Sequence, residues 1–243
     1  MQLKKDIHDL FKKFGYKIAK FSPNNYAPAR CKQILDKYRI DTVIDIGANA
    51  GQFATELRCA LGYSPYKNRI ISFEPLSSAF KLLKERAELD PKWDVFNAAL
   101  GDTDENTEIN IAGNSYSSSL LDMLPSHIKS APESKYVGRE IIEVKRLDSI
   151  FDNLCKPNNR VFMKIDTQGY ESKVLKGAEK SLLQIDTVQL EMSLVPLYDG
   201  ELLFNEMCKL MSEKGYTLVA IDQEYIDQNS GQLLQVNGIF HRL

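Results

Sequence analysis

The hydrophobic residues of this chain fall into two patterns, compact apolar runs and helical spacings. Val, Ile, Leu and Phe gather in runs bounded by Gly, Pro, Asn or Asp, which is typical of buried strands. These runs cover residues 42–46, 69–75, 93–100, 160–166 and 187–194. The helices expected from apolar residues at every third or fourth position cover residues 52–61, 77–88, 147–154 and 201–214. This alternation predicts an α/β fold on a parallel sheet.

Two more pairs of strands are expected outside this alternation. Residues 216–222 and 233–243 are joined by a polar loop around Asn229-Ser230-Gly231, which suggests an antiparallel terminal pair. Residues 107–112 and 140–146 also alternate as strands do. They enclose residues 113–138, a polar segment rich in Ser, Tyr and Pro. An insertion of this length is usually a functional loop or a lid.

The first 40 residues form an expected helical extension ahead of a single domain over residues 41–243. Leu3, Ile7, Leu10, Phe11, Phe14 and Ile18 have helical spacing, and lysines occupy the other faces. Residues 21–28 are expected to be a linker, and residues 29–38 a second helix. A basic amphipathic helix can lie on an anionic membrane. Packing across the domain or a subunit interface is favoured over that contact, and an oligomer is compatible with it.

Composition narrows the class of protein. A length of 243 residues suits one α/β domain with an extension. The net charge of -2 gives no basic field, so no nucleic-acid partner is expected. No apolar run is long enough to span a bilayer, and the N-terminus lacks the apolar centre of a secretion signal. The four cysteines show no Cys-x-x-Cys spacing and are expected to be reduced thiols of a cytoplasmic protein.

The turn after the first strand is the strongest single motif. It reads Asp45-Ile46-Gly47-Ala48-Asn49-Ala50-Gly51, where a dinucleotide fingerprint would read Gly-x-Gly-x-x-Gly. An acid at the end of the strand would repel a phosphate. The pattern resembles the nucleoside-binding turn of methyltransferases that use S-adenosylmethionine (SAM), where the acid lies near the positively charged methionine end. A generic strand-to-helix turn with an Asn starting the helix is the alternative.

Two later strand ends add candidate ligands for a nucleoside. Glu74, followed by Pro75, ends the second strand more than 20 positions after the Gly turn, where a carboxylate can accept both ribose hydroxyls. A surface carboxylate that caps the next helix is the alternative. The third strand ends in Asn97-Ala98-Ala99, whose small side chains would let an adenine ring lie flat. Core packing alone could also explain the two alanines.

The fourth strand carries the candidate chemistry. Lys164 and Asp166 are two positions apart, so both point to the same side of the strand, and an ion pair is expected. Glu191 lies near the end of the fifth strand. The carboxyl ends of parallel strands share one edge, so Asp166 should face the same crevice as Asp45 and Glu74. A strand-end ion pair that only stabilises the sheet is the alternative for Lys164 and Asp166.

Five segments stand in a fixed order along the chain, at residues 43–51, 72–75, 97–102, 146–148 and 163–171. The most specific is Lys164-Ile165-Asp166-x-x-Gly169-x-Glu171, followed by Val174-Leu175-Lys176-Gly177-Ala178. Together these segments resemble the FkbM family of methyltransferases over about residues 40–195. Residues 1–40 and 113–138 lie outside the shared motifs.

The resemblance implies a Rossmann-like class I methyltransferase fold, with a mostly parallel seven-stranded sheet and an antiparallel C-terminal strand. It also implies SAM-dependent methylation, typically of an oxygen on a sugar, glycan or secondary metabolite, as in polysaccharide biosynthesis. Gly47, Asn49 and Gly51 would line the methionine and ribose, Glu74 would hold the ribose hydroxyls, and Ala98 and Ala99 would flank the adenine. The expected cofactor-binding residues are Asp45, Gly47, Ala48, Asn49, Gly51, Glu74, Pro75, Asn97, Ala98, Ala99 and Asp166.

Methyl transfer to a hydroxyl needs alignment of the acceptor and removal of its proton. Asp166 is the candidate base, or a ligand of a Mg²⁺ ion, with Lys164 beside it and Glu191 as a second carboxylate. A third oxygen ligand is missing next to Glu191, where Met192 stands. His127 in the insertion is a rival base. Methylation of an amine or carboxyl group, and a non-catalytic SAM-binding subunit, remain the alternative functions.

Overall fold

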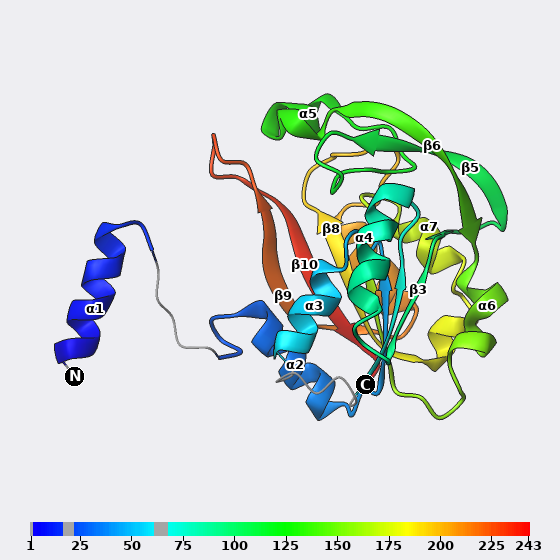
Figure 1. The fold of residues 1–243 in the computed structure, drawn as a ribbon, viewed down its shortest axis with the longest axis horizontal. Coiled ribbons are helices and arrows are strands. Elements are labelled where there is room, and N and C mark those ends of the chain that lie inside the picture. Colours follow the sequence, from blue (N-terminus) through cyan, green and yellow to red (C-terminus); the bar gives the residue numbers. More distant parts are fainter. Residues whose placement is uncertain (1, 17–21, 61–67) are drawn as a thin grey trace.

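A computed structural model describes residues 2–16, 22–60 and 68–243 (Figure 1). Within these residues, seven strands form a central sheet in the order β3-β2-β1-β7-β8-β10-β9. All neighbouring strands in this sheet run parallel except β10, which is antiparallel to both β8 and β9. The strands are β1 Thr42–Ile46, β2 Arg69–Phe73, β3 Trp93–Phe96, β7 Val161–Ile165, β8 Ile185–Ser193, β9 Thr217–Ile226 and β10 Leu233–His241. The expected sheet with one antiparallel C-terminal strand is confirmed.

Helices cover both faces of the sheet because alternate strand residues point to opposite sides. Val43 of β1 and Phe162 of β7 pack with residues of the first helix group, which consists of α2 Ala27–Lys37, α3 Gln52–Ala60 and α4 Ser77–Ala87. Ile44 and Met163, one position further along each strand, pack with residues of the second group. That group consists of α6 Leu147–Leu154, α7 Glu171–Lys176 and α8 Phe204–Glu213, with the short helix η2 Ser181–Gln184 before β8. Near-continuous apolar strands follow from this two-sided burial.

The run at residues 93–100, expected as one strand, divides into two. β3 ends at Phe96, and β4 Ala99–Leu100 pairs with another sheet. Asn97 lies at the break, and its Nδ2 donates to the carbonyl oxygens of Glu74 and Pro75, both at 2.9 Å. This bond ties the turn after β3 to the end of β2.

Much of the expected insertion is ordered structure. β5 Glu105–Ala112 and β6 Tyr136–Lys145 pair antiparallel and join β4 in a sheet with the order β4-β6-β5. Between them lie α5 Pro125–Ser130 and the short helix η1 Pro132–Ser134. In Figure 1, β5, β6 and α5 form a green layer beyond one end of the central sheet. The segment expected to be an insertion therefore begins after β5 and includes the start of β6.

The N-terminal region has two helices in the described residues, α1 Gln2–Lys13 and α2. The first helix was expected to extend to residue 20, but α1 ends at Lys13 and residues 14–15 form a turn, where Gly15 has φ +79°. Residues 17–20 lie outside the described residues, as does most of the loop expected at 62–68. Ile7, Leu10, Phe11 and Phe14 are exposed in this chain. None of the described helices combines the length and the hydropathy needed to cross a bilayer.

Candidate functional site

A cavity of about 180 Å³ lies at the carboxyl ends of β1, β2, β7 and β8. We call it the strand-end cavity. Of the sequence-predicted site residues, its lining contains Gly47, Asn49, Glu74, Pro75, Ala99, Asp166 and Glu191. The polar loop after β5 forms another wall, through Ser115, Tyr116, Ser118, Ser119 and Leu120. The fold thus brings most of the predicted residues to one concave surface, where ligands of open α/β sheets bind.

A second cavity of about 300 Å³ adjoins it on the side of α2, α3, β9 and β10. We call it the adjoining cavity. Tyr116, Asp166 and Glu224 line both cavities, as do Gly47 and Asn49. Ala48 and Lys164 reach only the adjoining cavity. The two spaces therefore meet at Asp166.

The Gly turn, residues 47–51, is shaped by two glycines with positive φ. Gly47 has φ +78°, and a Cβ on it would lie 1.8 Å from the carbonyl oxygen of Asp166. Only glycine lets the turn approach the end of β7 so closely. Gly51, with φ +84°, packs instead against Trp93 and Leu83. It shapes the turn from the core side and does not line either cavity.

Glu74 connects the Gly turn to the turn after β2. Its Oε2 accepts a hydrogen bond from the backbone N–H of Asn49 at 2.8 Å, and its Oε1 accepts one from the backbone N–H of Leu76 at 2.9 Å. Burial raises the pKa of this carboxyl to about 7. Each carboxylate oxygen has a second acceptor direction. Glu74 can therefore hold two further donors in the strand-end cavity.

The wall expected to contact an adenine ring is only partly as predicted. Ala99 lines the strand-end cavity, whereas Ala98 is buried and Asn97 acts through the turn described above. Leu76, Ile109 and Leu120 complete an apolar slot beside Pro75 and Ala99. Strand-end patterns do not predict these three residues, because they come from a helix start, from the second sheet and from the loop after β5.

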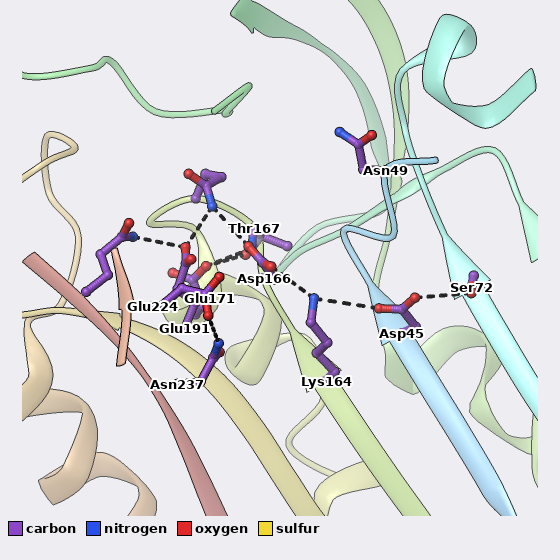
Figure 2. Close-up of polar contacts among 12 residues, drawn as sticks. Asp45, Asn49, Ser72, Lys164, Asp166, Thr167, Glu171, Glu191, Glu224 and Asn237 are labelled. Carbon is purple, nitrogen blue, oxygen red and sulfur yellow. Dashed lines mark hydrogen bonds and ion pairs between the residues drawn. The ribbon is translucent and has the colours of Figure 1, made fainter. Parts of the chain in front are cut away.

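Lys164 lies between two aspartates (Figure 2). Its Nζ is 3.0 Å from Oδ2 of Asp166 and 3.7 Å from Oδ1 of Asp45. Burial disfavours the charged ammonium, but the carboxylates of Asp166 and Asp45 outweigh it and raise the pKa of Lys164. The ring of Phe53 adds a cation–π contact at 5.2 Å. The expected pairing of Lys164 with Asp166 is confirmed.

Asp45 lies beneath the crevice instead of facing it. Its side chain is 0% exposed, and Oδ1 has no hydrogen-bond partner among the described residues. Oδ2 accepts the Ser72 hydroxyl at 3.4 Å. Burial raises the pKa of Asp45, and Lys164 opposes that shift. Asp45 points toward the face that α3 covers, because it follows Ile44 by one residue in a period of two.

Gln168 joins the two carboxylates that the sequence analysis singled out. Its Nε2 donates to Oδ1 of Asp166 at 3.0 Å and to Oε2 of Glu191 at 2.7 Å. Its Oε1 accepts the Tyr198 hydroxyl at 2.8 Å. The sequence analysis missed this role because residue 168 lies in a turn with φ +55°, where a side chain's direction cannot be inferred from strand alternation.

Glu191 is 7% exposed and lines the strand-end cavity from β8. Its Oε2 accepts both Gln168 and Gln235, the latter at 2.9 Å. Within the described part of the chain, no hydrogen bond reaches Oε1. Burial, followed by the nearby carboxylate of Asp166, raises the pKa of Glu191 well above its usual range. Glu191 is therefore a carboxyl group with one oxygen anchored and one available.

The residues do not fit the Mg²⁺ ion considered from the sequence. The amide of Gln168 fills the space between Asp166 and Glu191 that the ion would need. Across residues 2–16, 22–60 and 68–243, no group of three His, Cys, Asp or Glu side chains is arranged to hold a metal. As they stand, the two carboxylates are bridged by a hydrogen-bond donor.

His127 does not reach either cavity. It is buried, with its ring edge-on to Tyr198 at 5.1 Å. Burial lowers its pKa to about 4. His127, considered from the sequence as a rival base, is instead a buried residue of α5.

Backbone strain gathers at the strand-end cavity. Four described residues other than glycine have positive φ, and three of them, Asn49, Ser115 and Gln168, line this cavity. Such conformations persist where surrounding contacts hold them, often at functional sites. Asn49 Nδ2 is 3.5 Å from Ser115 Oγ, and Gln52 Nε2 donates to the Tyr116 hydroxyl at 3.2 Å, so the strained segments face each other across the cavity.

The strand order, with antiparallel β10 between β8 and β9, defines a Rossmann-like class I methyltransferase fold. A family model described as the methyltransferase FkbM domain matches residues 45–218. The chain belongs to the FkbM methyltransferase family. No curated protein matches the chain.

Three solved structures illustrate the similarity. Methyltransferase FkbM from Methylobacillus flagellatus KT is 14% identical with a TM-score of 0.46, and the match covers 82% of this chain and 43% of that one. An uncharacterised protein from Listeria monocytogenes serotype 4b is 7% identical with a TM-score of 0.48, over 88% and 67%. A SAM-dependent methyltransferase from Aquifex aeolicus is 11% identical with a TM-score of 0.44, over 92% and 100%. The chain therefore spans less than half the length of the Methylobacillus protein.

Proposed function

We propose that the protein transfers a methyl group from SAM to a hydroxyl of a sugar or glycan-type acceptor. The observation that carries the cofactor assignment is the placement of Glu74. Both of its oxygens are anchored by backbone amides, and its remaining acceptor directions serve the strand-end cavity. A carboxylate held in this way at the end of the second parallel strand suits the two hydroxyls of a ribose.

The other walls support a nucleoside in the same place. The apolar slot between Pro75, Leu76 and Ala99 suits the flat faces of an adenine ring. The Gly turn presents backbone close to the cavity without side chains in the way. When bound, SAM supplies a methyl group that is attached to a positively charged sulfur. The sulfur becomes a neutral thioether once the methyl group is transferred. Asp166 gives the far end of the cavity a complementary negative charge, and Glu191 adds to it when it is ionised.

The geometry favours different roles for the two carboxylates. Both oxygens of Asp166 accept hydrogen bonds, one from Lys164 and one from Gln168. These two hydrogen bonds hold the Asp166 carboxylate in place from both sides. Glu191 has a free oxygen and a raised pKa, which suit a general base. In the proposed reaction, an acceptor oxygen takes the methyl group and its proton passes to Oε1 of Glu191, while Asp166 and Lys164 fix the surrounding charges.

The activity is tested with purified protein, SAM labelled in the methyl group, and a panel of sugars, nucleotide sugars and polysaccharide fragments. Amine and carboxylic acid acceptors complete the panel. The expected product is a sugar whose hydroxyl has become a labelled methyl ether. Label only in amines or esters would contradict O-methylation, and SAM binding without any product would favour a non-catalytic subunit.

Replacing Glu74 with Gln should weaken binding of S-adenosylhomocysteine, the product form of the cofactor. The side-chain NH₂ of Gln must face a donor, which is the backbone N–H of either Asn49 or Leu76. The negative charge that residue 74 offers to the ribose hydroxyls is also lost. Hydrogen bonds to charged groups contribute about 1.5–3 kcal/mol, so roughly 10- to 100-fold weaker binding is expected. Titration calorimetry measures it. Glu140→Gln is the control, because Glu140 accepts a hydrogen bond from the Ser77 backbone N–H and does not line the strand-end cavity. Equal affinities of Glu74→Gln and the native protein would contradict the role of Glu74.

Binding of the same ligand should release protons near pH 6.5. Burial raises the pKa of Glu74 to about 7, so part of the free protein is protonated there. Ribose hydroxyls donate to the ionised form and favour it, so affinity should fall as pH drops below about 7. Calorimetry in two buffers with different ionisation enthalpies measures the released protons. The effect should vanish in Glu74→Gln, and buffer-independent enthalpies in the native protein would contradict it.

A further inference from the structure

We propose that Gln168 occupies the position of a divalent cation between Asp166 and Glu191, and that the site therefore works without such a cation. Gln168 is then a positioning residue, which holds two carboxylates of like charge at a fixed separation. The part of this inference that concerns turnover rests on the proposed methyl transfer. The part that concerns cation binding does not.

The contacts of the amide nitrogen carry the inference. Nε2 of Gln168 lies within hydrogen-bond distance of one oxygen from each carboxylate, at 3.0 Å and 2.7 Å. An amide NH₂ has two protons, so it can satisfy both oxygens at once. A Ca²⁺ or Mg²⁺ ion shared by the same oxygens would need about 2.0–2.6 Å to each of them, in the space that the NH₂ group fills. The amide and a cation are therefore mutually exclusive there.

The amide of Gln168 is also held from the opposite side. The hydroxyl of Tyr198 donates to Oε1 of Gln168 at 2.8 Å. Tyr198 is buried, and Gly169 packs so closely on it that a Cβ there would lie 2.9 Å from the Tyr198 Cβ. If the amide turned over, its oxygen would face the Asp166 and Glu191 oxygens with no proton between them. The two carboxylates thus favour the donor-inward orientation, in which Oε1 accepts the Tyr198 hydroxyl.

Neighbouring acids do not complete a cation site around the pair. Glu171 accepts the amide and hydroxyl of Thr167, at 2.7 Å and 3.1 Å. Glu224 accepts the Asn237 amide at 2.6 Å. Figure 2 shows the carboxylates of Glu171 and Glu224 close to that of Glu191, each engaged with its own donor. A cation at this position would need a further oxygen, which a carboxylate at residue 168 would place between Asp166 and Glu191.

Gln168→Glu is the sharpest test. It replaces the bridging donor with a third carboxylate of nearly the same shape, which would converge with the oxygens of Asp166 and Glu191 and bind a divalent cation. Gln235→Glu is the matched control, since Gln235 donates to the same Glu191 oxygen from β10 and makes no bond to Asp166. Both variants add one negative charge beside Glu191. Only the first adds it between the two carboxylates.

Mn²⁺ alone is titrated into the native protein and both variants, and free Mn²⁺ is followed by electron paramagnetic resonance. The native protein and Gln235→Glu should show no saturable binding up to about 1 mM, and Gln168→Glu should bind at least tenfold more tightly than either. Saturable binding by the native protein at lower concentration would overturn the inference. So would an equal gain in Gln235→Glu, or no gain in Gln168→Glu with its circular dichroism unchanged.

Turnover supplies a second test, and its chelator experiment uses the native protein alone. Methyl transfer by the native protein should be unchanged after treatment with a chelator, and loss of activity that Mg²⁺ restores would overturn the inference. Gln168→Ala should lower kcat more than tenfold with cofactor affinity changed less than threefold, because it releases the two carboxylates. If no acceptor is ever methylated, the proposed function fails, while the Mn²⁺ titration still decides the role of Gln168.

Discussion

Glu191→Gln should lower kcat by about 10²–10⁴, the usual contribution of a positioned general base, and leave affinity for SAM nearly unchanged. The substitution suits the site because the Gln carbonyl oxygen can replace Oε2 and accept both Gln168 and Gln235. Its NH₂ group then takes the place of the free oxygen and cannot accept a proton. The change therefore removes the chemistry and keeps the hydrogen bonds.

Asp166→Asn provides the contrast. Both Asp166 oxygens accept from donors, so an Asn NH₂ must face either Lys164 or Gln168. This variant should lose stability as well as activity, whereas Glu191→Gln should lose activity alone. Steady-state kinetics and urea denaturation of both variants separate the roles. Turnover of Glu191→Gln within about threefold of the native protein would assign the proton to another group.

The pH dependence of kcat should follow the ionisation of Glu191. Burial raises the pKa of Glu191, so its ionised form becomes abundant only as pH rises through that raised value. Activity that needs the carboxylate should therefore increase with pH on this limb. A rate that falls with rising pH over the same range would contradict a carboxylate base.

Lys164→Met should destabilise the fold by about 3–5 kcal/mol at neutral pH, which is the usual cost of leaving the other partner of a buried ion pair without its counter-charge. Asp45 is 0% exposed, and Lys164 is the cation beside it, at 3.7 Å. Without that ammonium, the Asp45 carboxylate must either remain charged in the core or take up a proton. Urea denaturation monitored by circular dichroism gives the free energy of unfolding.

Two further variants identify the cause. Asp45→Asn combined with Lys164→Met removes both charges and should recover more than half of the loss. Lys173→Met is the surface control, because Lys173 pairs with Asp102 at 3.4 Å in an exposed position and should change stability by less than about 1 kcal/mol. A double variant as unstable as Lys164→Met alone would show that lost packing, and not the unpaired carboxylate, sets the cost.

The stability that Lys164→Met loses should depend on pH through the ionisation of Asp45. Burial already raises the native-state pKa of Asp45, and removing Lys164 removes an influence that lowers it. A group with a raised native pKa stabilises the fold below its unfolded pKa, and this stabilisation is lost as pH rises through the native value. The stability difference between the native protein and Lys164→Met should therefore grow as pH rises through the raised native-state pKa of Asp45.

Glu74, Asp45 and Gln168 show which side-chain positions sequence patterns can predict. Glu74 ends a strand, and the ends of parallel strands share one edge, so its place at the cavity follows from local pattern and fold class. Asp45 lies near a strand end but before the turn begins, so strand alternation puts it beneath the crevice. Gln168 lies in a left-handed turn, where no periodicity predicts the direction of a side chain.

The amino-acid sequence by itself determined the sheet, the Gly turn, the pairing of Lys164 with Asp166 and the family, because strand and helix periods and motif spacing are properties of the local chain. Only the tertiary structure decided that Gln168 bridges Asp166 and Glu191, that Asp45 supports Lys164 from below, and that His127 is buried. These contacts join residues from β1, β7, β8, α5 and the loop after β7. Their distances depend on strand order and on turn geometry, which no single segment of the chain encodes.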